Sequence, residues 1–365
     1  MALKFQYTPA ASSTFSPASI EFSFAGPEPL PGRLVALVGP NGTGKTILLS
    51  NLALAAFEVG GPDRQARRLE VGAVEFGAGV IDQVVFVSYS AYDSFEMPAS
   101  APSEGVDPAR HLAEEGYVYV GLREITAATA EDRKSRPLTL KSIEKIENEF
   151  TEVLGALKGD RLDAFVEQVR TIFDEPSVER IHPLPPGGDD AAVVAHLRAA
   201  FPRLSTGHKA IINVVASLSR YLKPDTLVLL DEPEAHLHPP LIAVLLSVTR
   251  KLLKRFKAFA IVATHSPVVV QETLGQHVIV LNRADDITGW SVAEFETYGE
   301  NIATITRNVF GLSPGRADFV AELEALVRKG MSREQIEALF PRKMSSSARA
   351  QVIRAGSRVA GEDAS

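Results

Sequence analysis

The sequence predicts an α/β fold with a mostly parallel central sheet, because segments of strand and helix character alternate along most of the chain. A glycine-rich loop, Gly39–Thr46, lies between a buried apolar segment and a helical one. Two adjacent acids, Asp231 and Glu232, end a second apolar segment. A buried carboxylate is costly unless it meets a cation or a donor, so these acids raise the question of what pairs with them.

The composition is that of a compact globular protein. The chain has 365 residues, 45% of them apolar, and a formal net charge of −7. That charge gives no global attraction for nucleic acid, so such binding needs a local basic surface or a partner subunit. The absence of cysteine excludes disulfides and thiolate metal sites. No apolar run is long enough to span a bilayer and no secretion signal begins the chain, so we expect a cytoplasmic protein without membrane contact.

Residues 1–137 are expected to form the first half of the core, with an antiparallel N-terminal edge. The strands and the helix predicted there are Ser19–Phe24, Arg33–Gly39, Lys45–Gly60 and Val84–Ser90. Periodicity weakens over residues 93–137, where only Gly116–Leu122 has strand character, and we expect irregular surface structure.

Residues 138–190 are expected to form a helical insert, since apolar residues recur three or four apart through Leu138–Phe173. Residues 191–310 return to the alternation of the core. The elements predicted there are helices Ala191–Ala200, Lys209–Leu222 and Pro240–Phe256, strands Thr226–Leu230 and Ala258–Ala263, and a hairpin within His277–Phe295.

Residues 311–365 are expected to form a C-terminal helical extension. The spacing of Phe319, Leu323, Leu326 and Val327 predicts one buried helical face. Ser332 and Gln335 have the spacing of a capping box. The last twenty or so residues are basic and rich in serine, and we expect them to be frayed.

The loop GPNGTGKT has the Walker A pattern G-x-x-x-x-G-K-S/T and the strand and helix context that the pattern requires. Its glycines let backbone N–H groups converge on phosphate oxygens, Lys45 reaches the β- and γ-phosphates, and the Thr46 hydroxyl can ligate Mg²⁺. The alternative is a glycine-rich turn with a chance Lys-Thr pair. The residues expected to bind nucleotide are Gly39, Pro40, Asn41, Gly42, Thr43, Gly44, Lys45 and Thr46.

The positions of Asp231 and Glu232 predict a different role for each acid. Asp231, at the carboxyl end of a core strand neighbouring the phosphate loop, is expected to hold Mg²⁺ together with Thr46 as a Walker B acid. Glu232 points elsewhere and is expected to accept a proton from the attacking water. The alternative is an acid pair favoured by a helix dipole and by Pro233.

Two further residue groups complete the predicted site. His265 follows another aliphatic strand and is positioned to donate to a γ-phosphate; an ordinary polar residue at a strand end is the alternative. In LSTGHKA, Ser205 and Gly207 lead into a helix and are expected to form a second anion site, with a simple N-cap as the alternative. Two phosphate sites in one chain suggest two chains enclosing shared nucleotides.

In this order the motifs resemble the ABC-type ATPase fold of the SMC, RecF and RecN repair proteins. The segments LSTGHK, DEPEAHLHPP, ATHSPVVVQE and YGENIATITRNVFGL are similar to the prokaryotic AAA-15/AAA-21 ATPases related to the OLD family, which include ATPase subunits of antiphage systems such as Septu, PARIS and some retrons. The resemblance covers Ser19 to Leu312. It implies an ABC-type P-loop NTPase that uses ATP and Mg²⁺ and forms an ATP-dependent homodimer or higher oligomer. Ser205 and Gly207 of one chain would close over the nucleotide held by Lys45 of another.

Several residues depart from the pattern of transporter ATPases. Those proteins usually carry Gln after the strand that ends here in Ser88, Tyr89 and Ser90, and they end their signature with Gln where this chain has His208. No acidic cluster resembling a TOPRIM nuclease follows the core. If nucleic acid is cut, we therefore expect a separate effector nuclease of HNH or TOPRIM type.

Other charged residues leave two interpretations open. His236 and His238 could ligate a metal or belong to a conformational segment in the position of the D-loop. The basic run Arg250–Lys257 could be a solvated helix face, and the basic tail could bind nucleic acid or an acidic partner.

The leading hypothesis is therefore an ATP hydrolase that assembles through ATP and regulates an effector in antiphage defence, with Glu232, His265 and Lys45 as its catalytic residues. The alternatives are a repair ATPase of the RecF/SMC class, a transporter motor, and a scaffold that uses ATP as a structural switch.

Overall fold

The computed structural model divides the chain into two compact units, Met1–Ile305 and Thr306–Ser365, which are described separately. The finer division of the first unit into two core halves and an insert stays a prediction. The residues that the structure describes are 3–11, 13–16, 18–26, 30–57, 64–91, 95–100, 102–127, 139–179, 183–185, 188–311 and 318–362.

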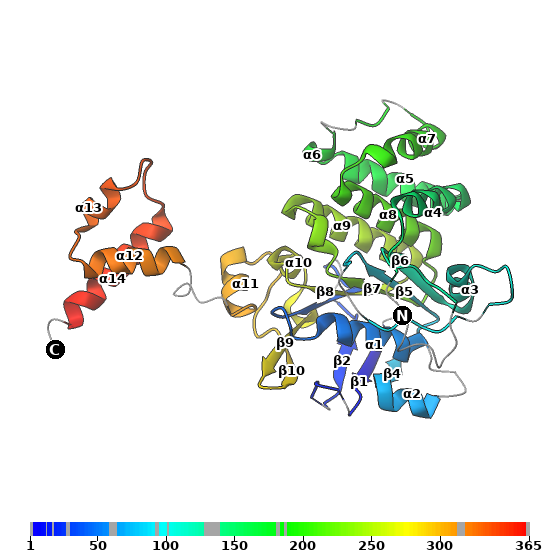
Figure 1. Cartoon of the computed structure of the whole chain (residues 1–365), viewed down its shortest axis with the longest axis horizontal. Coiled ribbons are helices and arrows are strands. Elements are labelled where there is room, and N and C mark those ends of the chain that lie inside the picture. Colours follow the sequence, from blue (N-terminus) through cyan, green and yellow to red (C-terminus); the bar gives the residue numbers. More distant parts are fainter. Residues whose placement is uncertain are drawn as a thin grey trace. The chain divides into compact units, whose positions relative to one another are not determined.

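The first unit is built around a seven-stranded sheet in the order β10-β9-β3-β8-β7-β5-β6 (Figure 1). All neighbouring strands pair in parallel except β10, which closes an antiparallel hairpin with β9. The mostly parallel sheet and the hairpin predicted from the sequence are confirmed. The strands are β3 (Leu34–Val38), β5 (Gln83–Ser88), β6 (Tyr117–Gly121), β7 (Thr226–Asp231), β8 (Phe259–Thr264), β9 (Val278–Ala284) and β10 (Ile287–Val292).

The antiparallel N-terminal strands form a separate three-stranded sheet in the order β2-β1-β4, rather than an edge of the central one. Its strands are β1 (Lys4–Thr8), β2 (Ile20–Ser23) and β4 (Ala73–Ala78). Alternate side chains of β1 are buried, and Phe5 stacks on Phe22 across the strands with ring centroids 5.1 Å apart. Strands β1 and β4 were not predicted from the sequence, because they are short and bury only one face.

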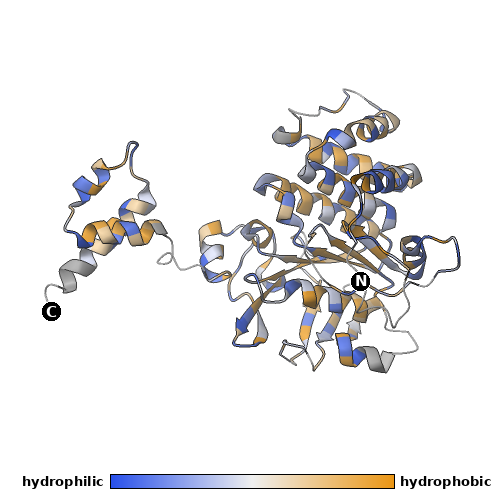
Figure 2. Cartoon of the chain, viewed as in Figure 1, coloured by the Kyte–Doolittle hydropathy of each residue, from blue (hydrophilic) through white to orange (hydrophobic). Residues whose placement is uncertain are grey.

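Helix α1 (Lys45–Phe57) is packed between the two sheets (Figure 1). One hydrophobic core joins it to the small sheet and to alternate residues of the central strands, such as Leu227 and Leu229 of β7. The residues between them face the opposite way, where α8 (Thr206–Tyr221) and α9 (Pro239–Phe256) cover the sheet. The central strands are accordingly hydrophobic on both faces (Figure 2).

A lobe of helices packs on α8 and α9. Its helices are α4 (Ile143–Ala156), α5 (Asp160–Phe173), α6 (Pro176–Glu179) and α7 (Asp190–Ala200). Phe150 of α4 stacks on Phe201 with ring centroids 3.8 Å apart, and Arg255 of α9 pairs with Asp160 and Glu167 of α5. Arg255, one of the residues of the basic run on α9, is thus paired with acids of this lobe.

Short elements complete the first unit and the link to the second. They are α2 (Arg64–Val71), α3 (Pro108–Glu115), α10 (Pro267–Gln271), α11 (Ile302–Asn308) and the 3-10 turns η1 (Phe201–Arg203), η2 (Pro233–His236) and η3 (Gly275–His277).

The strand predicted at Gly116–Leu122 is confirmed as β6, which is fully buried. Irregular surface structure is wrong elsewhere in the described part of residues 93–137, which contains helix α3 and the buried side chain of Phe95. The Arg123 guanidinium lies 4.7 Å from the Phe95 ring centroid and donates to the Phe95 carbonyl at 2.7 Å. Such packing depends on single contacts and leaves no periodic signal in the sequence. Residues 128–138 lie outside the described part of the chain.

The second unit contains α12 (Asp318–Arg328), α13 (Arg333–Ala338) and α14 (Ser346–Glu362), which share a small apolar cluster. The predicted capping box at Ser332 and Gln335 is confirmed. The predicted buried face of α12 is wrong at Phe319, which is 48% exposed, whereas Val320 is 1% exposed. The spacing of Val320, Leu323 and Val327 defines the buried stripe instead.

The prediction that the C-terminal tail is frayed is also wrong, because residues 346–362 form helix α14. Ala348, Val352 and Ala355 recur at helical spacing and pack in the cluster with Leu323 and Val327 of α12. Their small side chains made the stripe hard to recognise. Among the described residues, no helix has both the length and the apolar character needed to cross a membrane.

Replacing Gly121 by Ala should destabilise the first unit. A Cβ at this position, the last of β6, would lie 1.9 Å from the Ser88 carbonyl oxygen of the neighbouring strand. We expect Gly121→Ala to lower the free energy of unfolding by about 2 kcal/mol or more, measured by urea unfolding. Gly155→Ala is the matched control, because a Cβ there meets nothing within 4 Å and helix α4 should gain about 0.5 kcal/mol. Equal stabilities of the two variants would contradict the close contact of β5 and β6.

Candidate functional site

The phosphate loop connects β3 to α1, and its conformation requires glycine at two positions. Gly42 and Gly44 have φ angles of 83° and 86°, in the left-handed region that favours glycine. Lys45 is the first residue of α1, and its side chain is only 4% exposed. Its Nζ donates to the carbonyls of Gly39 at 3.1 Å and Pro40 at 3.4 Å. The loop therefore presents a helix N-terminus and a lysine to the same pocket, which suits a phosphate group.

The outer side of this loop is braced by residues that the sequence analysis did not identify. The Thr288 hydroxyl of β10 donates to the Thr43 carbonyl at 3.2 Å, and Arg283 of β9 donates to the Gly42 carbonyl at 3.1 Å. The Phe15 ring packs against Gly44: a Cβ added to Gly44 would lie only 2.8 Å from the Phe15 ring. Because the peptide is planar and trans, a Thr43 carbonyl held outward turns the Gly44 N–H the opposite way. No local sequence signal identifies these contacts, because they join segments far apart in the chain.

Asp231 lies against the start of helix α1, although β8 separates its strand from β3. The Thr46 hydroxyl donates to Asp231 Oδ1 at 3.1 Å, and the Asp231 side chain is buried. A hydroxyl and a carboxylate oxygen in contact are hard donors of the kind that Mg²⁺ prefers. This donor set fits the predicted metal role of Thr46 and Asp231.

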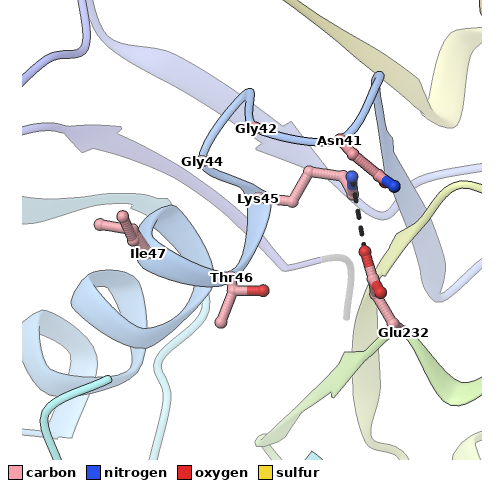
Figure 3. Close-up of a pocket in the computed structure, with 7 residues that line it drawn as sticks. All are labelled: Asn41, Gly42, Gly44, Lys45, Thr46, Ile47 and Glu232. Carbon is pink, nitrogen blue, oxygen red and sulfur yellow. Dashed lines mark ion pairs between the residues drawn. The ribbon is translucent and has the colours of Figure 1, made fainter. Parts of the chain in front are cut away.

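Glu232 lies across the pocket from Lys45. Its carboxylate Oε1 is 3.6 Å from Lys45 Nζ (Figure 3). The same oxygen is 3.6 Å from His265 Nδ1, so the three residues that the sequence proposes as catalytic lie together. Its side chain is 30% exposed, which leaves it open to water. Its φ of 42° is unusual for a residue other than glycine and costs about 1 kcal/mol or more. A pocket of about 260 Å³ is lined by Asn41, Gly42, Gly44, Lys45, Thr46, Ile47 and Glu232.

A third acid, Glu234, contacts His265, and no role for it was predicted from the sequence. Its side chain is 5% exposed and lies in η2, two residues after Glu232. Its Oε1 accepts the backbone N–H of His265 at 2.8 Å and the Thr264 hydroxyl, and lies 3.3 Å from His265 Nδ1. The available signal in the sequence was the third acid of the segment DEPE, two residues after Glu232.

Ser205 and Gly207 lie at the N-terminus of α8, where the signature was predicted. Ser205 caps the helix by accepting the His208 N–H at 3.3 Å, and its side chain is exposed. A Cβ on Gly207 would stand 2.4 Å from the His236 carbonyl oxygen, so glycine is needed for α8 to approach η2. These contacts are made within one chain, and a role of Ser205 and Gly207 in the nucleotide site stays a prediction.

The position of the transporter glutamine is taken by a tyrosine with a buried hydrogen bond. Asn213 of α8 donates to the Tyr89 hydroxyl at 2.9 Å, and burial raises the pKa of that phenol far above its ordinary value. The Tyr89 carbonyl lies 3.3 Å from His236 Nε2. The end of β5, the signature helix and η2 are thus linked directly. His238 instead caps α9, with its Nδ1 accepting the Leu241 N–H at 3.3 Å.

Residues 123–271 match the model of the AAA_21 family, described as "AAA domain, putative AbiEii toxin, Type IV TA system". The matched range contains Ser205, Asp231, Glu232 and His265, and the phosphate loop precedes it. The chain is also 27% identical over 348 residues to Protein ea59 of Escherichia phage lambda. That alignment covers 91% of this chain and 64% of the relative, so the chain spans less than two thirds of the relative's length.

Solved structures with similar folds include the SMC head domain from Thermotoga maritima, at 13% identity and a TM-score of 0.37, covering 81% of this chain and all of that one. Another is a nucleotide-free ATP-binding cassette from an ABC transporter, at 14% identity and a TM-score of 0.38, covering 86% of this chain and 96% of that one. The strand order and the phosphate loop, rather than these scores, define the fold of this chain.

Replacing Thr288 by Val should weaken nucleotide binding without unfolding the protein. The change removes the hydroxyl that holds the Thr43 carbonyl and keeps the shape of the side chain. Losing one such hydrogen bond corresponds to about a fivefold loss of ATP affinity, measured by titration calorimetry. Thr288→Ser keeps the donor and is the matched control, expected to stay within about twofold of the unaltered chain. The bracing role is excluded if Val and Ser give the same affinity.

Proposed function

We propose that this chain, whose core is an ABC/SMC-like AAA ATPase domain, binds ATP with Mg²⁺ at the phosphate loop and hydrolyses it. One observation carries the proposal: Glu232 lies 3.6 Å from both Lys45 and His265. Beside them, Thr46 and Asp231 are in contact at 3.1 Å. An ammonium, a carboxylate open to water and an imidazole around one pocket are the groups that phosphoryl transfer to water requires.

Each residue has a definite task in this reaction. The loop N–H groups and Lys45 bind the β- and γ-phosphates and offset their negative charge. Glu232 accepts a proton from the water that attacks the γ-phosphorus, as the bond from that phosphorus to the ADP oxygen breaks. His265 donates to a γ-phosphate oxygen.

Thr46 and Asp231 would hold Mg²⁺, since their oxygens are in contact at 3.1 Å. When bound, Mg²⁺ would neutralise part of the negative charge of the phosphates. Asp231 then has the cation that a buried carboxylate needs.

Assembly through ATP is the second part of the proposal. Ser205 is exposed at the N-terminus of α8, so its hydroxyl and the helix dipole are available to a phosphate on a second copy of the chain. The helices α4 and α5 pack on α8, and Lys209 of α8 pairs with Glu147 of α4 at 3.1 Å. Closure of α8 on a partner's nucleotide would therefore carry the helical lobe with it.

The biological role that we propose is control of a separate effector, of HNH or TOPRIM nuclease type, in antiphage defence in the cytoplasm. The AAA_21 match and the motif resemblance support it. Nucleic acid would be contacted through that partner or through a local basic surface.

Glu232→Gln tests the proposed base. The change removes the proton acceptor and keeps the size of the side chain, so we expect turnover to fall about 100-fold while ATP affinity stays within about threefold. Phosphate release and nucleotide titration measure the two effects. Glu114→Gln, on the exposed face of α3, is the matched control. A Glu232→Gln variant that hydrolyses ATP at the rate of the unaltered chain would show that Glu232 is not the base.

Mixing two inactive variants tests the shared site. Lys45→Ala disables the phosphate loop, and Ser205→Arg blocks the signature at an exposed position. In mixed dimers one of the two composite sites keeps both residues, so an equal mixture should recover about a quarter of the unaltered activity. Activity that does not rise on mixing would contradict a composite site. The mass of Glu232→Gln with and without ATP, measured by light scattering, reports the assembly itself.

A further inference from the structure

The Glu234 side chain occupies a position that the reaction described above does not explain. It is a carboxylate, 5% exposed, in the turn between the Walker B acids and α9. Burying an ionised acid is unfavourable unless its oxygens are satisfied. We propose that Glu234 is a positioning residue for ATP hydrolysis: it holds His265 with a proton on Nδ1 and leaves Nε2 to meet the γ-phosphate. This inference rests on the proposed function.

The contacts of Glu234 converge on one of its two oxygens. Oε1 accepts the His265 N–H at 2.8 Å and the Thr264 hydroxyl, and it lies 3.3 Å from His265 Nδ1. Oε2 is buried and has no hydrogen-bond partner among the described residues. Only the oxygen that faces His265 is satisfied, so the acid is directed at the histidine rather than shared with the surrounding core.

The same acid fixes the backbone that carries His265. The Thr264 hydroxyl also accepts the Ser266 N–H at 2.9 Å, and Ser266 caps α10 by accepting the Val268 N–H at 3.3 Å. Glu234 thus anchors the turn from β8 into α10 on both sides of the imidazole. Its own position is fixed in η2, where the Leu237 N–H donates to the Glu234 carbonyl at 2.9 Å.

The neighbours of Nδ1 determine which imidazole nitrogen carries a proton. The groups that face it are Glu234 Oε1 at 3.3 Å and Glu232 Oε1 at 3.6 Å, and ionised carboxylates only accept hydrogen bonds. Nδ1 must therefore be a donor. Donation from Nε2 to a phosphate oxygen then makes the bound ring an imidazolium, whose charge lies beside the two carboxylates. A histidine held in this way cannot turn its nitrogens away from the phosphate without losing its contact to Glu234.

Two substitutions at Glu234 differ in whether the buried side chain can still accept hydrogen bonds. Glu234→Leu removes the acceptor, and Glu234→Gln keeps an oxygen in its place. We expect Glu234→Leu to lower kcat about tenfold with KM for ATP changed less than about threefold, because the lost interaction acts in the transition state. Glu234→Gln should keep kcat within about threefold of the unaltered chain, because its amide oxygen still accepts hydrogen bonds. Thermal unfolding of both variants shows whether they fold.

A double-mutant cycle tests whether Glu234 acts through His265. If it does, Glu234→Leu should reduce kcat less than about twofold when His265 is already replaced by Ala. An equal loss in both backgrounds would overturn the inference, as would a rise in KM with kcat unchanged.

The position of the proton can be measured without turnover. In protein labelled with ¹⁵N in the histidine rings, the long-range ¹H–¹⁵N spectrum reports protonation of each ring nitrogen, and His265→Ala assigns the signals. We expect Nδ1 of His265 to be protonated in the unaltered chain and less so in Glu234→Leu. An unprotonated Nδ1, or no change in the variant, would overturn the inference. An unaltered chain that shows this proton placement but no ATP hydrolysis would leave the inference standing and reject the proposed function.

Discussion

The nucleotide site depends on the contacts that one buried lysine ammonium makes. Lys45 begins α1 beneath the phosphate loop, and its charge is met by the carbonyls of Gly39 and Pro40 and by the Glu232 carboxylate. A buried cation without such partners costs several kcal/mol. The loop must therefore curve around the lysine, which requires left-handed backbone at Gly42 and Gly44. It also requires that the strand carrying Glu232 end at the same edge of the sheet.

The strand order meets that requirement. β8 lies between β3 and β7, and the three strands run parallel with their carboxyl ends level: Val38 pairs with Thr264, and Asp231 with Ala263. The residues that follow each strand are then neighbours in space, as is general for ligand sites in open α/β sheets. The backbone N–H of Glu232 donates to the Ala263 carbonyl, which ties Glu232 to β8, the strand that His265 follows. One sheet edge thus assembles residues from three distant parts of the sequence.

Contacts around α8 link this edge to the helical lobe. Asn213 joins α8 to Tyr89 at the end of β5, and the close approach of Gly207 joins it to η2. On its other side, Lys209 pairs with Glu147 of α4. The same turn η2 holds Glu234 against His265, so α8 and His265 both contact η2.

The sequence by itself determined most strands of the central sheet, the helices that cover it, and the phosphate loop. A strongly periodic or fully apolar strand such as β7 needs no tertiary information, and neither does a phosphate loop whose glycines are required by its own backbone. The predicted helices α4, α5, α7, α8 and α9 follow from the same local patterns. The capping box at Ser332 is equally local.

Only the tertiary structure decided the contacts that join distant segments. The brace of Phe15, Arg283 and Thr288 behind the loop depends on how β10 pairs, which no local pattern records. The contact of Glu234 with His265 depends on β8 lying beside β7, and the packing of α14 depends on the face that α12 offers to Ala348, Val352 and Ala355. The physical reason is the same in each case. Local sequence determines dihedral preferences and shows apolar periodicity. Which side chains are buried and hydrogen-bonded depends also on the distant segment that packs against them.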